Sequence, residues 1–147
     1  MSKTEDIFEQ FLIKNQVQYI KSYKIYDIPF NTKQTHLVDF YLPEKDLYVE
    51  VKGFMTLYQI NILTYLSYHT DKSFYILQMT EEDWIEPYNR EFHKSISNKI
   101  KLNIEIQFNE ILENDNRYLE RISKERLEQY IKYRKDDLNK WLNKKEC

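Results

Sequence analysis

The architecture predicted for this chain is built around residues 38–53, VDFYLPEKDLYVEVKG. On both sides of a short polar segment that begins at Pro43, apolar residues alternate with polar or aromatic ones. Alternation of this kind is typical of strands with one buried face, and a proline followed by polar residues is typical of a turn. Residues 38–53 are therefore predicted to form a β-hairpin.

The register of this hairpin decides which side chains share a face. If Leu42 lies opposite Leu47, the same register brings Asp39 opposite Glu50, with Lys52 on the same face as Glu50. The alternating apolar residues then lie together on the other face: Val38, Phe40, Leu42, Leu47, Val49 and Val51. Facing carboxylates repel each other but suit a hard divalent cation. The spacing alone also fits an exposed hairpin of mixed charge, and a slip of one residue would break the pairing.

These residues carry a resemblance to a known family. Val38-Asp39 followed by Glu50-Val51-Lys52-Gly53 resembles the core of the PD-(D/E)XK nuclease superfamily, in particular phage junction-resolving endonucleases and the nuclease subunits of some transposons. The resemblance covers roughly residues 2–83, and Val38 stands where the family has a leading proline. Many members also carry an acidic residue in the first helix. Residues 2–12 resemble that helix, with Glu5 the better match and Glu9 the second choice.

The resemblance implies a fold and an activity. The fold would be α/β, a restriction-endonuclease-like core with a mixed β-sheet flanked by helices. The activity would be that of a divalent-metal-dependent DNA endonuclease, a hydrolase of phosphodiester bonds. Asp39, Glu50 and the Val51 carbonyl would bind Mg²⁺ or Mn²⁺, and Glu5 would position the attacking water or help to hold a second metal. Lys52 is expected to act as a cation, because two nearby carboxylates raise the pKa of an amine.

The rest of the chain predicts the elements around this hairpin. A helix is expected from about Lys3, an extended segment over 17–28, a helix over 57–69 capped by Thr56, and a buried strand over 73–79. A strand, a helix and a strand in succession predict a parallel pair and a mixed sheet. Another helix is expected after Thr80. Residues 102–108 alternate like an edge strand, with a helix as the alternative, and a long helix is predicted over about 116–144.

Composition bounds the remaining possibilities. With 147 residues the chain is expected to form a single domain, with an α/β core over 1–115 and a basic helical segment over 116–147. Residues 117–147 hold ten Lys or Arg and six Asp or Glu, a charge of +4, whereas the rest of the chain carries −6. That segment fits contact with DNA or an ordinary solvated helix. The lone Cys147 and the lack of a long apolar run favour a cytoplasmic protein without a membrane segment.

Competing interpretations stay open at this point. Cleavage of branched DNA would require a symmetric homodimer, because two strands must be cut. The main alternative to an enzyme is a catalytically inactive nuclease fold that acts as a DNA- or protein-binding regulatory module. A third is an acidic protein that occupies the DNA site of another protein.

Overall fold

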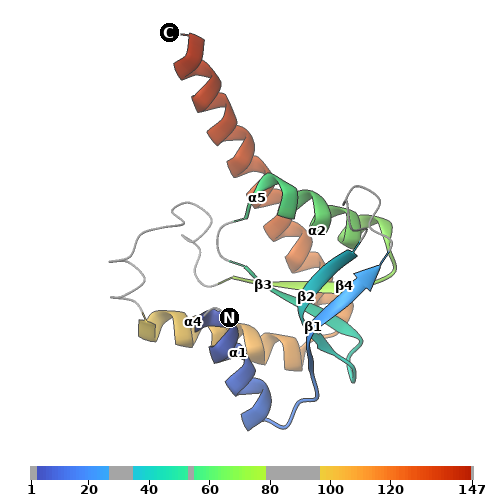
Figure 1. Cartoon of the computed structure of the whole chain (residues 1–147). Coiled ribbons are helices and arrows are strands. Elements are labelled where there is room, and N and C mark those ends of the chain that lie inside the picture. Colours follow the sequence, from blue (N-terminus) through green and yellow to red (C-terminus); the bar gives the residue numbers. More distant parts are fainter. Residues whose placement is uncertain (1–2, 27–34, 53–54, 79–96, 147) are drawn as a thin grey trace.

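The computed structural model describes residues 3–26, 35–52, 55–78 and 97–146. They form a four-stranded sheet between helices (Figure 1). The elements, in chain order, are α1 (Lys3–Lys14), β1 (Ile20–Tyr26), β2 (Thr35–Leu42), β3 (Leu47–Lys52), α2 (Leu57–His69), β4 (Ser73–Gln78), α4 (Ser97–Glu113) and α5 (Asn116–Glu146). The predicted α/β class, with a mixed sheet flanked by helices, is confirmed. The helix predicted after Thr80 lies outside the described residues.

The sheet has the strand order β1-β2-β3-β4. Strands β1, β2 and β3 form an antiparallel meander, and β4 is parallel to β3 after the crossover through α2. The predicted hairpin register is confirmed at Phe40–Val49, Tyr41–Tyr48 and Leu42–Leu47. The crossover helix begins where its cap predicts. The Thr56 hydroxyl accepts the Gln59 N–H while the Gln59 side chain accepts the Thr56 N–H, so both orphan donors are satisfied.

Helices cover both faces of the sheet. On one face α1 and α4 pack over apolar residues of the hairpin, and on the other α2 packs over β3 and β4 while α5 packs over β4 (Figure 1). Five of the six residues of β3 are therefore buried, Glu50 among them. The alternation puts the two carboxylates on the face of the hairpin away from its apolar residues, and that face is not free of core packing, because Glu50 is buried while Asp39 and Lys52 stay partly exposed.

The alternation of β2 reverses at Asp39. Val38 packs in the cluster that contains Tyr48, whereas Phe40 packs in the cluster on the opposite face. The expectation that Val38 and Phe40 share a face is therefore wrong. The cause lies in the pairing of β1 with β2, where no ladder pair joins Ser22 and Asp39 although their neighbours are paired. Ser22 has a φ of +53°, which bends β1 at this point.

The free edge of β4 is covered by side chains from two helices. The Ile76 N–H donates to Ser123 Oγ at 2.9 Å, and the Ile76 carbonyl accepts from Arg126. Two residues further along β4, the Gln78 N–H donates to Gln107 Oε1 at 3.0 Å, and Gln107 Nε2 donates to the Gln78 carbonyl at 2.6 Å. These side chains take the place of a neighbouring strand, so the edge offers no backbone groups at these positions for pairing with another chain.

The two long helices settle two further expectations. Residues 102–108 lie within α4, so the edge-strand interpretation is wrong and the helical alternative is right. Ile104 and Phe108, one turn apart, are buried, whereas Leu102 and Ile106 are each 57% exposed. The long helix predicted over about 116–144 is confirmed as α5, which packs on β4 and α2 and then extends away from the body (Figure 1). Among the described helices, none is both long and apolar enough to cross a membrane.

We expect Gln107→Leu to lower the free energy of unfolding by about 1–3 kcal/mol, because the buried Gln78 N–H loses its acceptor. The loss is limited at the Gln78 carbonyl, which still accepts from Asn103. Urea unfolding measures the change. The matched control is Gln129→Leu on the exposed face of α5, expected to stay within about 0.5 kcal/mol of the wild type. Equal values for the two variants would contradict the edge-capping role.

Candidate functional site

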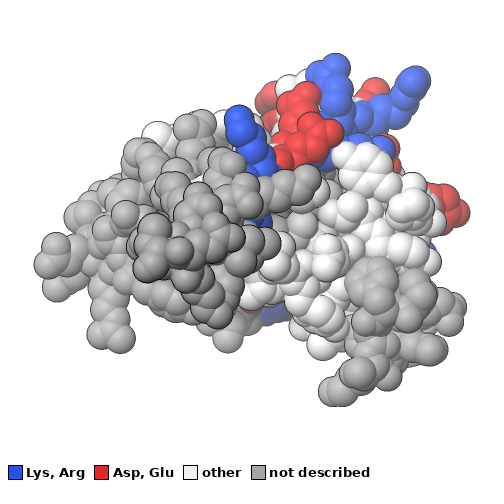
Figure 2. Space-filling view, turned by 90° about the horizontal axis from the view of Figure 1, so that it is seen from above, with Lys and Arg blue, Asp and Glu red and all other residues white. Residues whose placement is uncertain are grey.

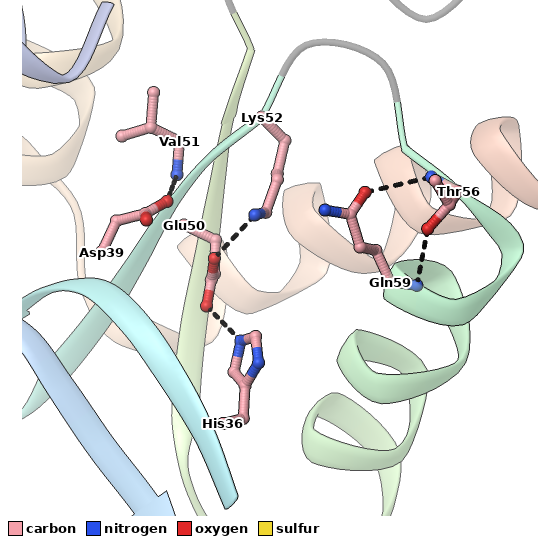
Figure 3. Close-up of polar contacts among 7 residues, drawn as sticks. All are labelled: His36, Asp39, Glu50, Val51, Lys52, Thr56 and Gln59. Carbon is pink, nitrogen blue, oxygen red and sulfur yellow. Dashed lines mark hydrogen bonds and ion pairs between the residues drawn. The ribbon is translucent and has the colours of Figure 1, made fainter. Parts of the chain in front are cut away.

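The site begins where β2 and β3 separate. Their last ladder pair is Phe40–Val49, so the predicted pair between Asp39 and Glu50 is not formed along the described strands. Instead, Asp39 Oδ2 accepts a hydrogen bond from the Val51 N–H at 2.8 Å (Figure 3). The side chain of Asp39 therefore takes the place that the backbone of β2 would occupy in a continued ladder, and it holds the two strands together at the fork.

Glu50 stands at the centre of the site and is fully buried. Its Oε1 lies 2.7 Å from His36 Nε2, and its Oε2 lies 3.4 Å from Lys52 Nζ. Figure 3 shows both of these side chains directed at the carboxylate, His36 from β2 and Lys52 from the end of β3. Since a buried charge is unfavourable unless it is paired, these two contacts offset part of the cost of placing Glu50 between two layers of helices.

The charges of the cluster shift the pKa values of Asp39 and Lys52. Burial, followed by the negative charge of Glu50, raises the pKa of Asp39 to about 7, against the opposing effects of Lys52 and of the hydrogen bond from Val51. Burial lowers the pKa of Lys52, but Glu50 and Asp39 outweigh it, so the pKa of Lys52 lies above its ordinary value. Lys52 is thus held as a cation, as the sequence led us to expect, and Asp39 changes charge near neutral pH.

The first helix brings one of its two candidate acids to this cluster. The negative charge of Glu5 contributes to the raised pKa of both Asp39 and Lys52, so Glu5 lies within electrostatic range of the pair. Glu9 is engaged elsewhere, because it accepts a hydrogen bond from the Tyr19 hydroxyl at 2.9 Å and forms an ion pair with Lys21 at 3.3 Å. Glu9 joins α1 to β1, and Glu5 is the acid of α1 that faces the candidate site.

His36 is the member of the cluster whose role the sequence left open between phosphate and solvent. Strict alternation along β2 would place it on the face of Phe40, away from Glu50. The reversal at Asp39 moves the residues before it to the other face, where Tyr48 and Glu50 lie. The sequence contains no glycine or proline at this point that would have signalled the reversal.

Two basic residues of α5 form hydrogen bonds within the fold. Arg126 donates to the Ile76 carbonyl, and Arg134 Nε donates to the Met55 carbonyl at 3.0 Å. Figure 2 shows the charged side chains of the upper face as an interspersed set of Lys, Arg, Asp and Glu. Both residues belong to the basic segment for which the sequence left contact with DNA or a solvated helix open, and both donate to backbone carbonyls of the protein itself.

Comparisons with protein-family models, with curated proteins and with solved structures gave no match for this chain. The functional interpretation therefore depends on the geometry and chemistry of the residues described above.

We expect Asp39→Asn to raise the free energy of unfolding, and to raise it more as the pH increases. The pKa of Asp39 is about 7 in the folded protein against an ordinary value of 3.8, so the folded state holds the proton more tightly than the unfolded chain. Its contribution to stability is present below about pH 4 and is lost as the pH rises through 7. The difference of about three pKa units corresponds to roughly 4 kcal/mol, which is the upper limit of the gain in the free energy of unfolding.

Urea unfolding in EDTA at several values between pH 4 and pH 8 measures this gain. The asparagine keeps an oxygen that can accept the Val51 N–H but carries no charge. Asp71→Asn, at an exposed position between α2 and β4, is the matched control and should show a small, pH-independent difference. A pH-independent difference for Asp39→Asn as well would mean that the burial of its charge does not strain the fold.

Proposed function

We propose that this protein is a divalent-metal-dependent DNA endonuclease with a restriction-endonuclease-like core. The observation that carries the proposal is the charge cluster at the fork of β2 and β3. It contains a fully buried Glu50, a second carboxylate with a pKa raised to about 7, and a lysine kept cationic beside them. Shifted protonation of this kind in a group of close charges is typical of a binding or catalytic site.

The donor groups at the fork fit Mg²⁺ or Mn²⁺. Asp39 and Glu50 supply carboxylate oxygens from neighbouring strands. Since the N–H and C=O of one residue leave a strand on the same side, the Val51 carbonyl is directed toward the Asp39 side as well. Within the described parts of the chain, no three His, Cys, Asp or Glu side chains are grouped to hold a metal. Magnesium sites often use only one or two carboxylates and complete the shell with water and substrate phosphate.

Each residue of the cluster then has a chemical task. A bound divalent cation supplies a more acidic water and offsets negative charge on the phosphate. Lys52 remains protonated and stabilises the charge that develops on the phosphate oxygens in the transition state. Asp39 must lose its proton to act as a ligand, so cation binding near pH 7 releases a proton from the protein. Glu5 approaches from α1 and orients a water molecule.

The decisive experiment is incubation with supercoiled, linear and branched DNA in the presence of Mg²⁺, Mn²⁺ or EDTA. We expect cleavage with either cation and none with EDTA. Asp39→Asn and Glu50→Gln should abolish cleavage, and Lys52→Ala should lower its rate by about 10²–10³-fold. DNA binding without cleavage under every condition would instead support the inactive, DNA-binding alternative. Preferential cleavage of branched DNA would call for a homodimer, which light scattering measures.

A matched pair of substitutions tests the assignment of the helix acid. We expect Glu5→Gln to lower the cleavage rate and Glu9→Gln, one turn along the same helix, to leave it within about twofold. The reason is that Glu5 acts on Asp39 and Lys52, whereas Glu9 is paired with Tyr19 and Lys21. Initial rates of plasmid nicking measure both. A loss of activity confined to Glu9→Gln would move the role from Glu5 to Glu9.

A further inference from the structure

The side chain of His36 lies at the fork, although no motif in the sequence singles it out. Its backbone is fixed on the far side by the ladder pair with Ile25 in β1. Its imidazole reaches in the other direction, across the gap where β2 and β3 no longer pair, to the buried carboxylate of Glu50. The side chain of His36 is itself 15% exposed. The imidazole of His36 in β2 therefore contacts the carboxylate of Glu50 in β3.

The chemistry of the contact decides its direction. A carboxylate accepts hydrogen bonds, so Nε2 carries the hydrogen at the 2.7 Å contact with Oε1. Lys52 lies at the other oxygen, at a longer distance of 3.4 Å. The short contact thus fixes the rotation of the carboxylate about its own axis, while the longer one leaves Oε2 available to a further partner. Within the described residues, Oε2 has no hydrogen bond apart from this ion pair with Lys52.

We propose that His36 is a positioning residue for the divalent cation site, in which it holds Glu50 in the orientation that presents Oε2 to the cation. This inference rests on the proposed function and adds a residue to it. Groups that hydrogen-bond to metal ligands orient those ligands before the metal arrives, and their loss weakens metal binding by about 10–100-fold. His36 acts on the cation through Glu50 and does not touch it.

Binding of Mn²⁺ to the metal-free protein, followed by electron paramagnetic resonance without DNA, tests the proposal independently of cleavage. His36→Phe keeps a ring of similar size but cannot donate a hydrogen bond, and we expect its dissociation constant to rise at least about tenfold. His36→Gln keeps an N–H donor of similar reach, and we expect its constant to stay within about threefold of the wild type. His69→Phe is the matched control, because His69 stacks on Tyr65 at the surface of α2. Its affinity should not change.

The outcomes separate this inference from the proposed function. Wild-type protein that binds Mn²⁺ no better than Glu50→Gln overturns both. Wild-type binding that His36→Phe leaves unchanged overturns the role of His36 alone. A loss of affinity as large in His36→Gln as in His36→Phe shows that the imidazole itself is required, which also overturns the positioning role. If His36→Phe does not fold, as judged by circular dichroism in EDTA, His36→Asn takes its place, because its amide is too short to reach Glu50, and the same loss is expected.

Discussion

The burial of Glu50 is the constraint to which the surrounding structure responds. Strand β3 lies inside the sheet, with α1 and α4 over one face and α2 and α5 over the other, so a carboxylate in its middle has no access to solvent. An unpaired charge in that position would cost several kcal/mol. His36 and Lys52 each approach one oxygen of Glu50, and burial, followed by the negative charge of Glu50, raises the pKa of Asp39. Two carboxylates brought together in this way are groups whose repulsion the proposed cation would offset.

The geometry of the cluster follows from an interruption in the sheet. If β2 continued its regular ladder with β3 beyond Phe40, its backbone would take the Val51 N–H and the carboxylate of Asp39 would have no place there. The reversal at Ser22 and Asp39 ends that ladder and leaves the N–H to the Asp39 side chain. Local departures from regular strand geometry are frequent beside active sites because they redirect side chains. Here the same departure places Asp39 at the fork and turns His36 toward Glu50.

Local patterns were enough to predict the elements, but not the way they enclose the site. Three features depend only on short segments of sequence, and each is found in the structure: the register of the hairpin, the capping box at Thr56 and the parallel strand after α2. The second helix layer over the sheet comes from α2 and α5, which follow the hairpin in the chain, so the alternation of the strands alone could not show that Glu50 is buried. In residues 102–108 two periods coincide, because Ile104 and Phe108 fit a strand as well as a helix. Tertiary packing against the sheet selects the helix.

Polar residues of α5 bind the protein's own backbone, and this limits the basic charge that α5 could offer to DNA. Ser123 and Arg126 cover the edge of β4, and Arg134 binds the carbonyl of Met55, shortly after the end of β3. Part of the basic charge of α5 therefore binds backbone groups of the protein itself, and the chain before residue 117 has a net negative charge. Phosphates approaching Asp39 and Glu50 would be repelled by both carboxylates. In the proposed enzyme a divalent cation at the fork removes that repulsion as well as supplying the reactive water, so substrate binding near the cluster and catalysis depend on the same ion.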